Sequence, residues 1–184
     1  MQFHRRLTMA VLVGAVSATA SSGVAAQGAA PTAKGGLNDP TIVAIFDAAN
    51  TWDIETGAMG AARGTSKEIR EFGKMLAYDH RTVRKQGRDL AAKLHVTPTP
   101  PKNFAMAKDH AVAVAKLKAA KGKAFDRVFL EHEVAYHKAV IDAVTTTLLP
   151  ALQNVDVKAL VTKVAPAFQA HMVAAQTLLD KLPR

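Results

Sequence analysis

The sequence predicts an all-α protein, a four-helix bundle with one additional shorter helix. Hydrophobic residues make up 49% of the chain but aromatic residues only 5%, and this alanine-rich, aromatic-poor composition is typical of close-packed helices. Long segments without proline show apolar residues at spacings of three and four, and no segment shows the alternation of a strand. Amphipathic helices joined by short connections bury their apolar faces against one another as a bundle.

Helix signals divide the chain after residue 38 into five segments. Asp39 followed by Pro40 is a typical helix start, with Asp39 as N-cap, and Gly64 is a candidate C-cap. The second helix follows the capping-box pattern TSKE at 65–68. The predicted helices span residues 40–63, 65–95, 104–120, 123–148 and 155–182.

Prolines separate or bend the later segments. The stretch VTPTPP ends the second helix, and Asn103 can cap the shorter helix that follows. Pro150 stops the third long helix. Pro166 lies inside the last one, where it predicts a kink.

The first 26 residues are predicted to be a signal peptide. MQFHRR is basic, and LTMAVLVGAVSATA has the length of a signal-peptide apolar region rather than of a membrane span. Small residues at positions 24 and 26 favour cleavage after Ala26, with Ala20 as the alternative. Residues 27–38 are Gly-rich and aperiodic and predict a flexible leader, followed by the helical domain at 39–182. We therefore expect an exported, periplasmic protein.

Charge and composition exclude several kinds of chemistry. The formal net charge of +9 falls to +7 after signal cleavage, because Arg5 and Arg6 leave and no acidic residue does. A basic surface of this kind allows weak association with anionic envelope components, although the scattered lysines favour a plain solvated surface. No basic block is interleaved with aromatics, so we expect no nucleic-acid partner. The absence of cysteine excludes disulfides and thiolate ligands.

The third long helix contains EHEVAYH, which places two histidines and two glutamates between Glu131 and His137. Apolar residues recur along this helix at spacings of three and four, and His137 occupies one position of that seam. Glu133 lies one turn earlier and flanks the same face. Glu131 faces away, and His132 points to a different edge. We therefore expect Glu133 and His137 to face the core.

The other long helices repeat this pattern, with one ionisable residue on each apolar seam. These residues are Glu55, His80 and His171, and Asp79 lies beside the seam of His80. Each seam residue lies about 14–16 residues from its predicted helix start, so all could meet near mid-height of a bundle.

Ionisable groups buried together without partners would be costly, and a bound cation would remove that cost. Three imidazoles with one or two carboxylates suit Zn, Cu or Fe better than Mg or Ca. Asp79 is expected to orient an imidazole. The predicted metal ligands are Glu55, His80, Glu133, His137 and His171.

A second interpretation stays open. The same residues can form a metal-free polar network inside a non-enzymatic envelope module that binds a protein or an anionic component. The sequence contains no Gly-x-Ser-x-Gly elbow and no thiol, and it assigns no catalytic residue. His95 and His110, on the Pro-rich loop edge and the shorter helix, are expected at the surface or at an edge of the fold.

Three stretches resemble an exported bacterial family called domain of unknown function 4142. They are MLAYDHRTVRKQGRDLAAKLHV, AFDRVFLEHEVAYHKAVIDAV and APAFQAHMVAAQTLL, and the similarity covers nearly all of 39–182. Its marks are Asp79-His80, Gly122 with Phe125-Asp126, His137, and Pro166 with His171. The resemblance implies a ferritin-like bundle in a periplasmic or envelope setting, and no settled activity.

The sequence lacks the ligand motif of the di-iron centres found in ferritin-like bundles. Di-iron bundles use Glu-x-x-His motifs, whereas the residues three positions before the seam histidines are Ala77, Val134 and Phe168. We therefore do not expect a carboxylate-rich oxidase centre.

Overall fold

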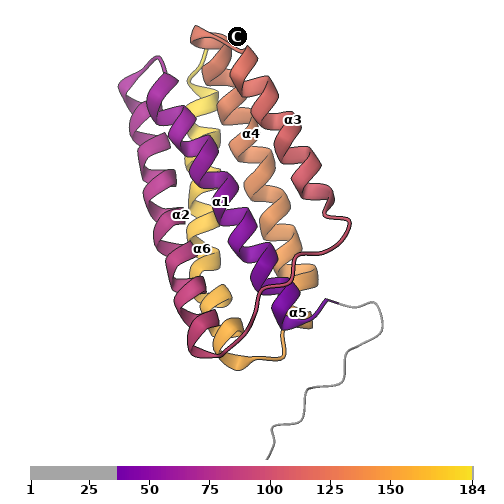
Figure 1. The fold of residues 1–184 in the computed structure, drawn as a ribbon. Coiled ribbons are helices and arrows are strands. Elements are labelled where there is room, and N and C mark those ends of the chain that lie inside the picture. The colour runs from indigo at the N-terminus through magenta and orange to yellow at the C-terminus, as the bar shows by residue number, and fades with distance from the viewer. Residues whose placement is uncertain (1–36, 184) are drawn as a thin grey trace, which may run out of the picture. The chain divides into compact units, whose positions relative to one another are not determined.

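A computed structural model describes residues 37–183, and these residues form helices and loops without any strand (Figure 1). The all-α prediction is confirmed for this part of the chain. The predicted signal peptide and all but the last two residues of the predicted leader lie outside it. No helix within residues 37–183 has the length and apolar character needed to cross a membrane. The helices are α1 Asp39–Arg63, α2 Lys67–Lys93, α3 Ala105–Ala119, α4 Gly122–Ala143, the π-helix η1 Val144–Leu148, α5 Leu149–Ala151 and α6 Val155–Asp180.

Four long helices form the bundle and α3 is the additional helix, as predicted. Helix α1 packs along α2, and α4 packs along α6, while contacts between α2 and α6 and between α1 and α4 close the bundle. The shorter helix α3 contacts α1 and α4 and lies on the outside of that pair (Figure 1).

The helix caps differ by one residue from two of the predictions. Asn38, not Asp39, caps α1 by accepting from the Thr41 amide at 2.9 Å. Asp39 instead accepts from the amides of residues 153 and 154, both at 2.9 Å, and so ties the start of α1 to the start of α6. Likewise Ser66 caps α2, because the Thr65 hydroxyl and amide both donate to Asp126 of α4.

The segment predicted as one helix at 123–148 is helical throughout, but it changes from α-helix to π-helix along its length. Helix α4 ends at Ala143 and a π-helical turn follows. The hydroxyls of Thr145 and Thr146 donate to the carbonyls of Ile141 and Asp142, which satisfies carbonyls that a wider turn leaves free. Helix α6, by contrast, runs through Pro166 as one helix.

Helices α1 and α2 approach closely enough to require glycine. A Cβ atom at Gly73 would lie 2.3 Å from the Ala61 amide nitrogen and 2.6 Å from the Gly57 carbonyl oxygen. Only a residue without a side chain fits this contact.

The apolar core is divided into two clusters by a polar layer. On α2, Leu76 belongs to one cluster and Val83 to the other, with His80 between them. On α6, Phe168 and Ala175 belong to different clusters and His171 lies between them. The packed clusters therefore hold the buried polar side chains between them in fixed positions.

Candidate metal centre

Three histidines from three helices meet in the polar layer. His80 of α2, His137 of α4 and His171 of α6 are 2%, 1% and 4% exposed. Their ring centroids lie 5.2 to 5.6 Å apart, and each ring offers one nitrogen within 4.8 Å of the others. The sequence prediction that these three residues converge is confirmed as a matter of geometry.

The tautomer of His80 is fixed by Asn50. The Asn50 side-chain nitrogen donates to the Phe46 carbonyl oxygen at 2.8 Å, so the amide oxygen is the atom turned toward His80. His80 Nδ1, 2.9 Å away, must therefore donate to it. This leaves a lone pair on His80 Nε2, which has no hydrogen-bond partner within residues 37–183.

The other two rings are fixed in the same way by different acceptors. His137 Nδ1 lies 2.9 Å from the Glu133 carbonyl oxygen and donates to it. His171 Nε2 lies 3.0 Å from Asp79 Oδ2 and donates to that carboxylate, the orienting role expected of Asp79. His137 Nε2 and His171 Nδ1 consequently carry lone pairs, and both are buried without a partner in the described chain.

Burial keeps the three imidazoles neutral. It lowers the pKa of His80 to about 2, with a further contribution from His137 and His171. It lowers the pKa of His137 to about 3, against the opposing hydrogen bond to the Glu133 carbonyl. Burial also lowers the pKa of His171. Neutral imidazole is the form that ligates metals.

Two buried carboxylates lie beside the histidines. Asp53 of α1 is 3% exposed and Glu133 of α4 is 0% exposed. Asp53 Oδ2 lies 3.5 Å from His80 Nε2, and Glu133 Oε2 lies 3.5 Å from His137 Nδ1. Each of Asp53, Glu133 and His137 offers one ligating atom within 4.8 Å of the others. The predicted inward position of Glu133 is thus observed, and Asp53 was not predicted.

The environment of the carboxyl pair disfavours its full ionisation. Burial raises the pKa of Glu133 to about 7. Burial, together with the adjacent Glu133 charge, raises the pKa of Asp53 well above its usual value. Asp53 Oδ1 and both Glu133 oxygens find no donor within residues 37–183. A proton or a cation is therefore required at this position.

The predicted inward position of Glu55 is wrong. Its side chain is 48% exposed and pairs with His110 of α3, with Oε2 and Nε2 3.0 Å apart. Helix α1 is covered on two sides, and Trp52 stacks against His110 at 5.2 Å between ring centroids. The apolar row that contains Trp52 and Glu55 therefore faces α3, while the row that contains Asp53 faces the bundle centre.

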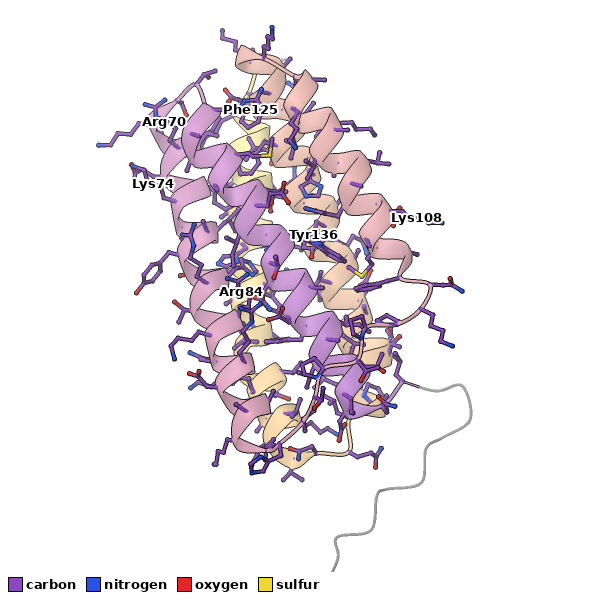
Figure 2. All side chains as sticks on the ribbon, in the orientation of Figure 1. Arg70, Lys74, Arg84, Lys108, Phe125 and Tyr136 are labelled. Atoms are coloured by element: carbon purple, nitrogen blue, oxygen red, sulfur yellow. The ribbon has the colours of Figure 1, made fainter. Side chains whose placement is uncertain are left out.

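The surface position predicted for His110 is wrong as well, because it is only 8% exposed under the α1–α3 contact. His95 is exposed as expected. His132 lies on another edge of α4, where its ring packs against Tyr136 at 5.5 Å between centroids. The Tyr136 hydroxyl donates to the Ala49 carbonyl at 3.0 Å and so links α4 to α1 (Figure 2).

A small cavity of about 30 Å³ adjoins the site. Its lining is largely apolar, with Met106 of α3 among the residues, and also includes Asn50, Asp53, His80 and His137. The volume is sufficient for one water molecule. The basic residues Lys74 and Lys108, by contrast, project from α2 and α3 away from the bundle (Figure 2).

The buried histidine cluster defines the class as a helical bundle with a potential metal site in its core. The chain belongs to the family described as domain of unknown function DUF4142, whose model matches residues 23–178. The comparison with curated proteins found no match.

Two solved structures share the fold. One is a DUF305 fragment from Deinococcus radiodurans, with a TM-score of 0.68 at 15% identity, covering 78% of this chain and 95% of that one. The other is described as CopM in the Cu(II)-bound form, with a TM-score of 0.62 at 12% identity, covering 80% of this chain and 100% of that one. At these identities the likeness establishes the helical-bundle fold alone.

Proposed function

We propose that this domain binds a transition-metal ion through His80 Nε2, His137 Nε2 and His171 Nδ1. The observation that carries the proposal is that each ring has its other nitrogen committed to an acceptor, while the remaining nitrogen is buried and unpaired. Three buried lone pairs on neighbouring rings are a cost to folding unless a Lewis acid or a proton donor satisfies them.

The geometry is close to what ligation needs. Metal–nitrogen bonds of about 2.0–2.1 Å in a tetrahedral site place neighbouring ligand atoms about 3.3 Å apart. Each of the three rings has a nitrogen within 4.8 Å of one on the other two, which is wider than this spacing, so ligation requires the rings to move closer together. The acceptors on Asn50, Glu133 and Asp79 already hold each ring in the required tautomer, as outer partners of metal-bound histidines do.

Copper and zinc are the favoured occupants, ahead of iron. Neutral imidazoles suit all three metals, and affinity for such a site rises from Fe(II) through Zn(II) to Cu(II). The Cu(II)-bound form of CopM has the same fold at 12% identity, which supports copper only as a precedent for metal binding by this bundle architecture. The donor set of the present chain carries the argument.

The test is a metal titration of the mature chain purified without a histidine tag. His137→Ala removes a ligand and should weaken Cu(II) and Zn(II) binding at least about 10–100-fold, since changes in outer partners alone have that effect. His132→Ala removes a nearby imidazole that points to another edge, and it should leave both affinities nearly unchanged. Binding to wild type that resists His137→Ala, or no binding at all, would leave the cluster as a metal-free polar network.

We also propose that the protein works after export, in the periplasm. The proposal is supported by the basic start, apolar run and small residues near position 26 in the sequence. Fractionation of cells that express the full chain, with N-terminal sequencing of the product, tests it directly.

A further inference from the structure

Two carboxylates extend the histidine cluster, and nothing in the described chain neutralises them. Asp53 and Glu133 are 3% and 0% exposed, and three of their four oxygens lack any donor. The buried polar residues between 37 and 183 include no lysine or arginine. Ionised carboxylates in such a place need a cation.

Asp53 lies beside one histidine of the cluster and belongs with Glu133 and His137 to a second group of candidate ligands, whose atoms lie within 4.8 Å of one another. Its Oδ2 lies 3.5 Å from His80 Nε2, the unpaired nitrogen of that ring. Two ligand atoms of one tetrahedral metal are about 3.3 Å apart. The pair therefore already has nearly the spacing of neighbouring ligands, and Asp53 approaches from α1, the one long helix that contributes no histidine to the cluster.

Charge balance indicates the occupant. Three neutral imidazoles contribute no charge, and Asp53 and Glu133 together contribute −2 when ionised. One divalent cation cancels this charge with both carboxyls ionised, a single Cu(I) does so only if one carboxyl keeps its proton, and two divalent cations leave two positive charges in excess. Asp79 is 39% exposed on its outer side, where solvent screens its charge.

We propose that Asp53 Oδ2 completes a three-histidine, one-aspartate site for a single divalent cation, with Glu133 as the second neutralising carboxylate. This inference rests on the proposed function, which it makes more specific: it names the fourth ligand, the stoichiometry and the oxidation state. Under this proposal, removing the Asp53 charge weakens the binding of Cu(II) and Zn(II) more than the binding of Cu(I).

The experiment compares Asp53→Asn with wild type for Zn(II), Cu(II) and, under reducing anaerobic conditions, Cu(I). The substitution keeps the shape of the side chain and removes its charge. Zn(II) and Cu(II) affinity should fall at least about 10-fold, while Cu(I) affinity changes by less than about 3-fold. The Cu(II) electron paramagnetic resonance spectrum should also change, because an oxygen ligand is lost. Wild type should bind one equivalent.

Glu55→Gln is the matched control, because Glu55 lies two residues from Asp53 on the same helix and faces α3. It should behave as wild type with all three ions. Thermal melts with chelator report whether Asp53→Asn is folded, and we expect it to be at least as stable as wild type without metal, since a buried charge is removed.

The outcomes separate the two proposals. If wild type binds no metal, the proposed function fails. If wild type binds metal and His137→Ala loses it, but Asp53→Asn keeps wild-type Zn(II) affinity and an unchanged Cu(II) spectrum, only the role of Asp53 fails. Two equivalents bound to wild type would overturn the single-cation assignment. An unfolded Asp53→Asn is replaced by Asp53→Ser, for which the same losses are expected.

Discussion

Acidification of the metal-free protein should lower its stability, because the buried histidines stay neutral in the folded state. His80 and His137 have folded pKa values of about 2 and about 3, against 6.5 in an unfolded chain. Between these values the unfolded chain binds more protons, so the free energy of unfolding falls as pH drops below 6.5. Glu133 acts in the opposite direction, because its folded pKa of about 7 lies above the ordinary 4.5.

The size of the effect between pH 7 and pH 5 follows from these values. A histidine that cannot protonate in the folded state loses about 2 kcal/mol over that interval, so His80 and His137 together lose about 4 kcal/mol. The protonation of folded Glu133 returns about 2 kcal/mol. The net loss from the three groups is about 2 kcal/mol. The lowered pKa values of His171 and His132 add to it, and the raised pKa of Asp53 reduces it.

The assay is denaturant unfolding in the presence of a chelator at pH 7, 6 and 5, for wild type and Glu133→Gln. The variant lacks the compensating carboxyl, so its loss between pH 7 and 5 should be about 2 kcal/mol larger than that of wild type. Wild-type stability that rises on acidification, or equal pH dependence in the two proteins, would refute the assignment of neutral histidines beside a protonated carboxyl pair.

Three further predictions concern packing, hydrogen bonding and processing. Gly73→Ala should destabilise the protein by about 1–3 kcal/mol or more in thermal melts, because the new Cβ would lie 2.3 Å from the Ala61 amide; a melting temperature equal to wild type would show that α1 and α2 separate easily. Tyr136→Phe should cost about 1 kcal/mol through the lost bond to the Ala49 carbonyl, with metal affinity unchanged in titration. N-terminal sequencing of exported protein should begin at Gln27, and a chain that retains the first residues would contradict the proposed export.

Most of the fold could be predicted because its signals are local. Proline, glycine and capping residues mark the helix ends, and the predicted ends lie within two residues of those observed for most helices. The π-helix Val144–Leu148 could not be predicted, because apolar residues at 144 and 148 keep the spacing of an ordinary helical turn. The caps at Asn38 and Ser66 were assigned to the neighbouring residue because Asp39 and Thr65 are equally good caps by type. Asp39 and Thr65 instead form hydrogen bonds to distant parts of the chain, and this leaves Asn38 and Ser66 as the caps.

The histidines of the site could be predicted because each sits on the seam of a helix with one buried face. Helix α1 differs, since it contacts the bundle on one side and α3 on the other. Apolar residues therefore occur around both faces, and the row through Trp52 is the more apolar one in the sequence. That row faces α3, so Glu55 lies outside the bundle centre. For the same reason the inward position of Asp53 was not predicted. The small residues Gly57 and Gly60, on the same face as Asp53, were the signal of the closer contact.

The distribution of unpaired atoms is the strongest reason to regard the polar layer as a binding site rather than a structural network. Seven buried side-chain nitrogen or oxygen atoms within residues 37–183 lack a partner, and six of them belong to Asp53, His80, Glu133, His137 and His171. A network that served folding alone would be expected to satisfy its members, because each unpaired group lowers stability. Here the second nitrogen of every histidine in the cluster is satisfied and the inward one is not. A cation at the centre of the cluster would satisfy these inward atoms together, whereas protons on the carboxyl pair would leave the histidine lone pairs without a partner.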